Sequence, residues 1–517
     1  MKNIIKFSAL AILTFVVGCA KLDEEPVGTL SPEGFFNTID DVNAMTDGTY
    51  GLMASSNFYG SGLTTPLQLS SDMVDNGLEF SDYTEFSPFL VTPTNSFVRD
   101  FWATAYQAIA TANTSIQGVG LLGDDIDQED KNIAEGEARF VRGFLYYHLV
   151  RLYGNLPYID SPDIVDPLSI ELSSTDEIYV KIIEDMTFAF DNLEMDSRGS
   201  VRSRPSKGTA ASYLASIYMT REEWKQSYDM AKWVIDNAGN LKYALEDDFQ
   251  DVFRESEQWA SQEYIFSIDF TGNQTGENPN PATYENDNKI GPFNGVEGGA
   301  KPIRGWSMLV PHINVYNSWD SNDYRLKVSM ADSLILADDT DIVRPFSEFE
   351  VARPHIAKFN RFTGEGRTTA GWRSDFDHAA FRYAEVLLIA AESANELGLS
   401  PESIGYVNQI RGRARNAGTI DFYGSGYGTY APSIFPADVL AGTNIDDLRT
   451  IILEERRIEL AFEFKRWYDI VRRDLGSEVF GPSGLEPQSN FSEFRYLWPI
   501  PQGEIDKNQN FVQNPGY

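Results

Sequence analysis

Few residues of the chain have the types and spacing that catalysis or metal binding requires. The sequence holds no Walker A loop, no G-x-S-x-G elbow, no H-E-x-x-H pair and no Rossmann glycine fingerprint. A single cysteine excludes an internal disulfide and a zinc site built on several thiolates. The carboxylates could include a glycosidase pair, but such a pair is defined by a separation in space that a sequence does not give. We therefore expect no enzyme activity, no cofactor and no metal. The histidines lie far apart in sequence: His148, His312, His355 and His378.

Aromatic residues in irregular segments are better candidates, because an exposed ring can stack on the apolar face of a ligand. Trp306 in IRGWSML and Trp372 in AGWRSD each stand beside glycine and arginine, away from any helical periodicity. Tyr284 comes next, with Tyr83 and Phe86 from EFSDYTEFSPF as further contributors. Core packing is the alternative for each of them. We expect a core position for the tryptophans that fall within helical or C-terminal motifs: Trp102, Trp224, Trp233, Trp467 and Trp498.

The one cysteine lies where a lipid anchor would be attached. Lys2 and Lys6 precede FSALAILTFVV, an apolar stretch of signal-peptide length that is too short to span a bilayer permanently. The following VVGC is similar to a bacterial lipobox, in which Gly18 precedes the cleavage and Cys19 becomes the lipidated first residue. Several acyl chains anchor stably, at about 0.8 kcal/mol per buried methylene. A chance cysteine at the end of an ordinary signal is the alternative.

The charge balance narrows the class of partner. The chain has 42 Lys+Arg against 77 Asp+Glu, a formal net charge of −35. Such a field repels phosphate backbones, so we expect no nucleic-acid partner. The acidic AKLDEEP after the cysteine resembles the export signal of surface lipoproteins of the Bacteroidetes, although a plain acidic tether is the alternative.

Helices must position most of these residues. Apolar stripes predict long helices over 97–116 and 136–159, with Gly154 and Pro157 ending the second. The stretch 206–239 reads as two antiparallel helices with Ser206 as cap and a break near TREE, and it resembles a tetratricopeptide unit. A further helix pair is predicted over 380–416.

Two other regions complete the outline of the chain. Within the irregular middle of the chain, roughly 250–375, residues 271–300 hold six Gly and six Asn with scarcely any periodicity, which is typical of long loops. Residues 451–473 predict one continuous amphipathic helix, with Glu463–Arg466 and Asp469–Arg473 spaced as ion pairs within it. The sequence thus predicts a helical scaffold that carries long loops.

Five motifs in order resemble the SusD/RagB family. They are CAKLDEEPVGTLSPEGFFNT, EARFVRGFLYYHLVRLYGNLPYI, FRYAEVLLIAAE with VNQIRGRAR, ERRIELAFEFKRWYDIVRR, and YLWPIPQGEIDKNQNFVQNPGY. The match runs from the lipobox to the last tyrosine. It departs mainly at FEFKRW, where members often have Gly-His before Arg-Trp; we expect this change to matter little, because it lies on the predicted helix.

The resemblance implies a mainly α-helical SusD-like fold, with tetratricopeptide-type helix pairs as scaffold and long irregular ligand-binding loops. It implies a lipid-anchored, surface-exposed outer-membrane protein that binds a polysaccharide or oligosaccharide and delivers it to a SusC-like TonB-dependent transporter. A peptide-binding, RagB-like uptake lipoprotein is one alternative, and a tetratricopeptide-type protein scaffold is another. The acidic surface favours a neutral glycan over a sulfated or uronic one.

The predicted divisions of the chain follow from these signals. They are a removed signal peptide (1–18), a lipidated acidic tether (19–30), an N-terminal helical region with tetratricopeptide-type pairs (31–250), a loop-rich region with the candidate ligand site (251–375) and a C-terminal helical region with the closing tail (376–517).

Overall fold

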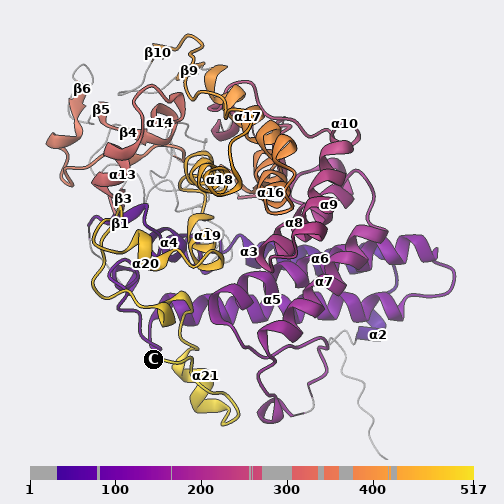
Figure 1. Ribbon diagram of the computed structural model, residues 1–517. Coiled ribbons are helices and arrows are strands. Elements are labelled where there is room, and N and C mark those ends of the chain that lie inside the picture. The colour runs from indigo at the N-terminus through magenta and orange to yellow at the C-terminus, as the bar shows by residue number, and fades with distance from the viewer. Residues whose placement is uncertain are drawn as a thin grey trace, which may run out of the picture.

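A computed structural model describes the chain over residues 32–78, 82–164, 166–254, 258, 260–270, 306–335, 343–359, 376–416, 418–420 and 428–517. Helices dominate these residues, and the strands are short and paired two by two (Figure 1). The mainly α-helical prediction is confirmed. The signal, Cys19 and the acidic tether lie outside the described residues.

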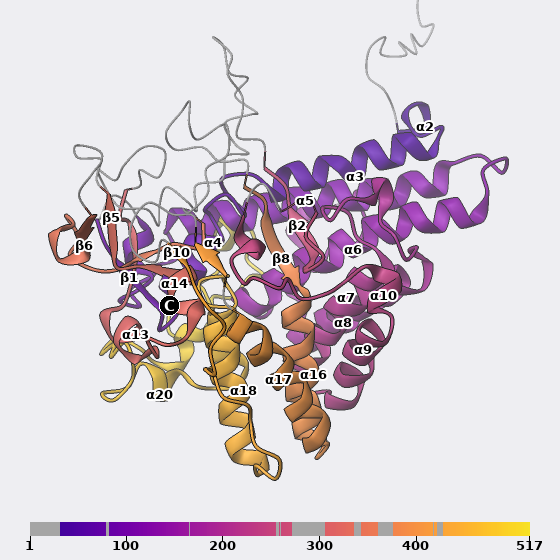
Figure 2. The ribbon, with the colours of Figure 1, turned by 90° about the horizontal axis from the view of Figure 1, so that it is seen from above.

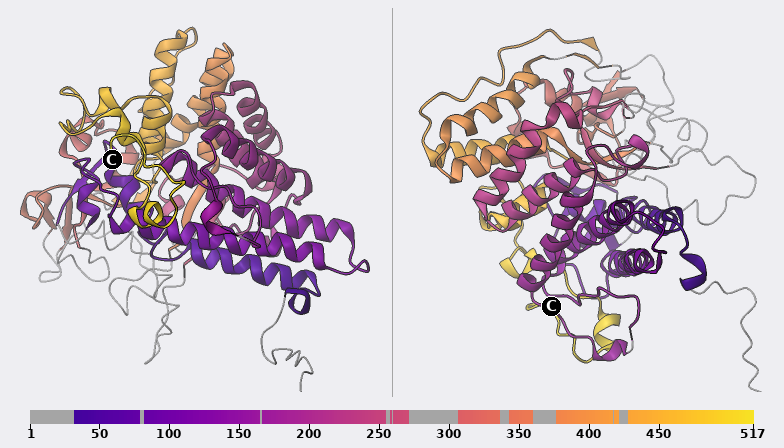
Figure 3. Two further views of the ribbon diagram at one scale, coloured as in Figure 1. Left: turned by 90° about the horizontal axis from the view of Figure 1, so that it is seen from below. Right: turned by 90° about the vertical axis from the view of Figure 1, so that its right-hand side faces the viewer.

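Helices that are adjacent in sequence pack on one another from α3 to α9, and the array continues into the C-terminal part. Helix α9 lies against α16, which packs on both α17 and α18. In Figure 3 the long N-terminal helices run side by side, and the orange and yellow helices stand beside them. The main helices are α3 (Ile39–Met53), α5 (Ser96–Leu121), α6 (Gln128–Tyr153), α7 (Thr175–Asn192), α8 (Lys207–Thr220), α9 (Trp224–Asp236), α16 (Tyr383–Glu396), α17 (Ser400–Asn416), α18 (Ile445–Glu459) and α19 (Arg466–Arg472).

Local sequence signals set the ends of these helices. Ser206 caps α8 and exchanges hydrogen bonds with Thr209, and Ser174 forms the same kind of capping box with Glu177 on α7. Helix α6 ends at Gly154, whose φ of 72° is readily adopted by glycine. The predicted pairs over 206–239 and 380–416 are both present, each with a short connection between its helices.

Short elements gather at one side of the helical array. The strands β1, β3, β4, β5 and β6 lie there with α13 and α14 (Figures 1 and 2). The pairs are all antiparallel: β1 (Val74–Asn76) with β3 (Leu309–Pro311), β2 (Tyr264–Ile268) with β8 (His378–Arg382), β4 (Met330–Ala331) with β7 (His355–Ile356), β5 (Ser333–Ile335) with β6 (Val343–Pro345), and β9 (Thr419–Ile420) with β10 (Gly428–Thr429). The short helices are α2 (Pro32–Phe35), α4 (Thr64–Leu69), α10 (Ala238–Leu241), α13 (Ile313–Ser318), α14 (Tyr324–Ser329), α20 (Gly476–Val479) and α21 (Gln502–Lys507).

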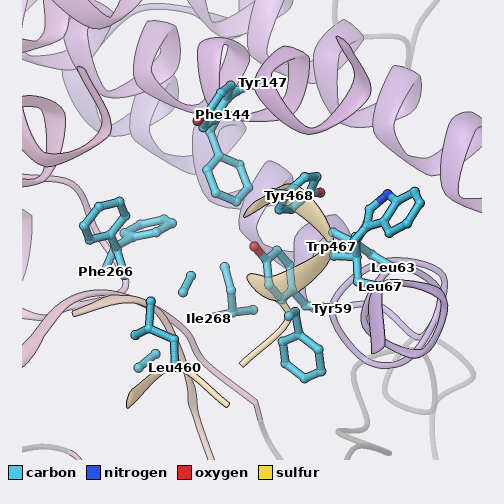
Figure 4. Packing of buried hydrophobic residues seen from close by; sticks show 14 of the residues in the cluster. Tyr59, Leu63, Leu67, Phe144, Tyr147, Phe266, Ile268, Leu460, Trp467 and Tyr468 are labelled. Carbon is cyan, nitrogen blue, oxygen red and sulfur yellow. The ribbon is translucent and has the colours of Figure 1, made fainter. Parts of the chain in front are cut away.

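One large hydrophobic core joins the N-terminal and C-terminal parts (Figure 4). Trp102, Trp467 and Trp498 are buried in it, as predicted. Trp224 and Trp233 are half-buried and pack against its edge. Burial of such large rings is the main source of stability here, at about 25 cal/mol per Å² of apolar surface.

The predicted continuous helix over 451–473 is wrong. Helix α18 ends at Glu459, the chain turns, and α19 begins at Arg466. Phe462 and Phe464 adopt left-handed φ angles of 66° and 62° within the turn, and both side chains are buried. The FEFK departure therefore lies in a buried turn and not on a helix.

The ion pairs expected within that helix are also different. Glu463 pairs with Lys358 and Arg382, and Arg466 pairs with Asp72. Asp469 pairs with Arg456 and Arg472 instead of Arg473. The chain accepts a strained turn at Phe462 and Phe464 because the turn places Glu459 and Glu463 beside the same buried arginine, Arg382.

Candidate functional site

The edge formed by β1 and β3 carries the one predicted ligand residue that is both described and partly exposed. Asp75 pairs with Val310 in this ladder. The pairing continues past the strands, because the Gly77 and Leu78 amides donate to the Met308 and Ser307 carbonyls, both at 2.8 Å. A Cβ on Gly77 would lie 1.9 Å from the Ser307 carbonyl oxygen, so this close approach requires glycine. Trp306 therefore stands where the ladder ends.

Trp306 is half-buried and packs against the core cluster. A partly covered indole of this kind can keep its orientation while part of its ring reaches solvent. Such a rigid, amphipathic ring is what stacking on an apolar ligand face requires.

A polar frame fixes the backbone beside Trp306. The ring nitrogen Nε2 of His355 lies 2.8 Å from the Ser307 hydroxyl, and Nδ1 lies 2.9 Å from the Arg353 carbonyl. Since a carbonyl only accepts, Nδ1 carries the proton and Nε2 accepts from Ser307. Burial lowers the pKa of His355 to about 4, so the ring is neutral at neutral pH.

Charged groups lie at the rim of the same edge. Arg353 donates from Nη1 to Asp75 Oδ2 at 2.8 Å, with about a third and a quarter of the two side chains exposed. The other carboxylate oxygen of Asp75 accepts from Ser87 at 3.2 Å. The edge that ends at Trp306 thus carries both a donor and an acceptor group at its rim, which suits a ligand with hydroxyl groups.

Two predicted ligand residues are instead part of the core. Tyr83 and Phe86 have 0 % and 1 % of their surface exposed. The Tyr83 hydroxyl donates to the Leu78 carbonyl, and the Phe86 ring packs 5.3 Å from that of Trp498. Their prediction as ligand contacts is wrong, because the chain turns both rings inward. The Tyr83 hydroxyl nevertheless helps to fix the candidate edge, because it bonds to Leu78, whose amide donates to Ser307.

The remaining predicted residues are not placed. Tyr284, Trp372 and Cys19 lie outside the described residues. The sequence reasoning missed Asp75, Ser307, Arg353 and His355. No spacing could have identified them, because Asp75 and Arg353 are 278 positions apart and meet only through the fold.

A second surface feature is hollowed, and its walls carry ion pairs. Two adjoining hollows of about 360 and 390 Å³ share Val201, Ser267 and Asp269 in their walls. Their cations already have partners: Arg198 and Arg204 pair with Asp47, Lys242 pairs with Asp196, and Arg202 donates to the Lys242 carbonyl. Tyr50, the aromatic residue of the second hollow, has its ring covered by Arg204 at 4.0 Å.

A buried charged cluster lies deeper, between α18 and β8. Arg382 contacts Glu263, Glu459 and Glu463 at 2.5, 2.7 and 2.7 Å. Arg413 and Arg325 also contact Glu459. Burial disfavours the charge of Glu459, but the three guanidiniums outweigh it and hold the pKa of that carboxyl well below its usual range. A carboxylate held ionised in this way does not serve as a general acid, so this cluster is structural.

Within the described ranges, no three His, Cys, Asp or Glu side chains gather as a metal site would need. The same part of the chain contains no helix whose length and hydropathy would let it cross a bilayer.

Two family descriptions together match most of the sequence, each over a different part. Residues 348–517 match the SusD family, and residues 22–219 match a family described as "Starch-binding associating with outer membrane". The "SusD-like protein P2" of Formosa agariphila is 41% identical over 527 aligned residues, which cover 99% of each chain.

Solved structures of the same fold are similar over nearly the whole chain. A SusD homolog from Bacteroides thetaiotaomicron has a TM-score of 0.76 at 22% identity and covers 94% of this chain and 98% of its own. The surface glycan-binding protein A of Bacteroides thetaiotaomicron, solved in complex with laminarihexaose, has a TM-score of 0.73 at 19% identity and covers 92% and 99%. At these identities the likeness concerns the fold.

Proposed function

Since the chain belongs to the SusD family, we propose that it is a cell-surface lipoprotein that binds a polysaccharide or oligosaccharide and delivers it to a SusC-like TonB-dependent transporter. The observation that carries the proposal is the 41% identity with a SusD-like protein over 99% of both chains. The protein acts by binding and not by catalysis: its buried carboxylates in the Arg382 cluster are ion-paired, which supports a structural role for them.

The ligand-binding surface lies at the end of the β1–β3 ladder, with Trp306 as a stacking residue. Three features of the described residues support this location: the half-buried indole, the polar frame of Ser307 and His355, and the Arg353–Asp75 pair at the rim. Tyr284 and Trp372 contribute from neighbouring segments of sequence in this proposal. Tyr83 acts only as a support.

A neutral glycan fits the charge of the protein better than a polyanionic one. At −35 overall, the surface repels sulfated and uronic chains before they reach the site. A neutral sugar carries an apolar C–H face for the indole and hydroxyls for the rim.

A peptide is the second candidate ligand. The negative charge of the protein would favour a cationic or extended chain, which could pair with the exposed carboxylates. A scaffold for other proteins is a third reading, since the helix pairs α8–α9 and α16–α17 are of the kind that stacks into protein-binding arrays.

The decisive experiment is a ligand panel on the soluble chain without residues 1–19. Calorimetry or affinity electrophoresis should detect a neutral glycan, and added salt should change its affinity little because no charge pairing is involved. Binding restricted to cationic peptides, weakening steeply with salt, would replace the glycan reading with the peptide one.

Delivery to a transporter has its own test. The full-length protein, tagged at its C-terminus and extracted from its own outer membrane, should co-purify with a barrel of the SusC type. Recovery of soluble proteins with no barrel would support the scaffold reading instead.

A further inference from the structure

A small cavity lies where α6, α8, β8 and α19 meet. Its volume is about 30 Å³, and its wall includes Tyr59, His148, Arg151, Tyr213 and Tyr468. Figure 4 shows Tyr59 and Tyr468 within the hydrophobic core, near the helix that carries Phe144 and Tyr147. A space of this size holds about one or two water-sized particles. Nothing in the candidate ligand site uses it.

One of the two tyrosine hydroxyls that contact His148 has no acceptor for its proton. The Tyr59 hydroxyl lies 3.0 Å from Nε2 and the Tyr468 hydroxyl 2.9 Å from Nδ1. Burial lowers the pKa of His148 well below its ordinary value, so the ring is neutral and has a single N–H. One tyrosine must therefore accept from the ring, and its own O–H then has no acceptor among the described residues.

One more donor belongs to the same space. Tyr213 is part of the cavity wall, and its hydroxyl makes no hydrogen bond within the described part of the chain, although only 4% of this residue is exposed. Buried donors of this kind normally have an acceptor, so the cavity requires one.

Arg151, which is half-buried, has no ion-pair partner among the described residues. Its guanidinium lies between the rings of Tyr147 and Tyr468, 3.6 Å from each centroid; its Nε donates to the Tyr147 carbonyl, and its Nη2 lies 3.5 Å from His148 Nδ1. No carboxylate of the described residues pairs with it. The three carboxylates in the wall are engaged elsewhere: Glu385 with Lys465, Glu463 with Arg382 and Lys358, and Asp469 with Arg456 and Arg472.

We propose that this cavity binds a chloride ion. A small monovalent anion accepts from the Tyr213 hydroxyl and the spare tyrosine O–H at once, and it balances the charge of Arg151. A larger anion such as sulfate does not fit the volume, whereas water would satisfy the donors and leave the charge unbalanced. The ion would join α6 and α8 to α19 and so connect the N-terminal and C-terminal parts of the fold.

Bromide gives the crystallographic test, because it replaces chloride and is identified by its anomalous signal. Crystals of the chain without residues 1–19, grown with sodium bromide, should show one anomalous peak among Tyr59, Tyr213 and Tyr468. Tyr213→Phe should reduce the peak several-fold, and Tyr218→Phe, which removes a hydroxyl on the same helix but outside the cavity wall, should not. Ordered water without an anomalous peak would overturn the proposal.

Thermal denaturation gives the test in solution. At equal ionic strength, the Tm should be higher in sodium chloride than in sodium gluconate, by about 1 °C at a tenfold excess over the dissociation constant. Arg151→Met should abolish this difference, whereas Arg139→Met, which loses pairs with Glu135 and Asp185 away from the cavity wall, should retain it. Equal Tm values in the two salts for the parent protein would contradict a bound anion.

Discussion

His355 on β7 accepts a hydrogen bond from the Ser307 hydroxyl at 2.8 Å, and this contact holds the residue next to Trp306. The bond depends on a neutral imidazole, because a protonated ring offers no acceptor at Nε2. The candidate ligand-binding edge is therefore tied to the protonation state of a buried histidine.

Low pH should lower the free energy of unfolding, because the folded protein holds His355 in its neutral form. Its pKa is about 4 in the folded state and about 6.5 when unfolded, so the unfolded chain binds more protons between these values. The stability contributed by the neutral ring is complete above pH 6.5 and falls by about 2–3 kcal/mol on going to pH 4.5.

Urea denaturation of the parent and of His355→Asn should test this at pH 7.5 and pH 4.5. The variant should be the less stable protein at pH 7.5, and the difference should shrink at pH 4.5, because asparagine does not titrate. The other buried histidines titrate in both proteins and cancel. A difference that is the same at both pH values would contradict the assignment.

The ion-pair cluster around Glu459 should be costly to break. Glu459→Gln leaves the guanidiniums of Arg325, Arg382 and Arg413 with less compensation in a buried site, and loss of one partner from such a cluster costs about 3–5 kcal/mol. Denaturation midpoints measure the effect. Asp236→Asn breaks the exposed pair with Lys232 on α9 and should cost below about 0.5 kcal/mol. Equal losses in the two variants would mean that the cluster is not stabilising.

Glu486 should have the opposite pH dependence from His355. Burial and the charge of Asp75 raise the pKa of this carboxyl well above its usual range, while Gln488 donates to it and the Ser87 hydroxyl lies within hydrogen-bond distance of both Glu486 and Asp75. The folded state therefore retains a proton that the unfolded state has lost, and stability falls as pH rises above about 4.5 toward the folded pKa.

Removing this carboxyl should therefore stabilise the protein at high pH. Glu486→Gln should be more stable than the parent at pH 8, by about 1.4 kcal/mol for each unit of raised pKa, and no more stable at pH 4. Melting curves at both pH values measure it. Glu493→Gln on η6 (Glu493–Tyr496), a carboxylate outside the buried set, should leave the parent's profile unchanged. A parent whose stability rises steadily from pH 4 to pH 8 while Glu486→Gln does not would contradict the sign.

The sequence predicted what local signals determine. Ser206, the break before Trp224 and the stop at Gly154 depend on neighbouring residues, and all three are present. The five motifs also identified the family correctly. These features could be predicted because each of them depends only on residues that lie a few positions away in the sequence.

The errors arise where partners are distant in sequence. The turn at Phe462 exists because Glu463 contacts Arg382, 81 positions away, and helical periodicity contains no trace of that contact. Phe86 is buried against Trp498, which follows more than 400 positions later, so its polar neighbours suggested a surface loop. The Asp75–Arg353 pair could not be predicted for the same reason.

Replacing the candidate tryptophans should weaken ligand binding, whereas replacing a matched control tryptophan should not. Trp306→Ala and Trp372→Ala should each weaken glycan binding at least about fivefold, the loss of about 1 kcal/mol that defines an important contact residue. Trp224→Ala removes a half-buried indole from α9, which the ladder edge does not include, and should leave the affinity unchanged. Calorimetry with the glycan found in the panel measures all three. If only Trp224→Ala weakened binding, the site would lie on the helical scaffold and not at the β1–β3 edge.

The lipid anchor at Cys19 is the last prediction. The expected acyl chains stabilise membrane attachment by about 0.8 kcal/mol per buried methylene, whereas no other anchor is predicted in the sequence. Cys19→Ala should move the protein from the outer-membrane fraction into the soluble fraction, or leave it with an uncleaved signal and a correspondingly higher mass. Thr29→Ala, a change further along the proposed tether, should fractionate as the parent does. An unchanged outer-membrane fraction for Cys19→Ala, with the signal cleaved, would show that the protein is held there by its partner and not by a lipid.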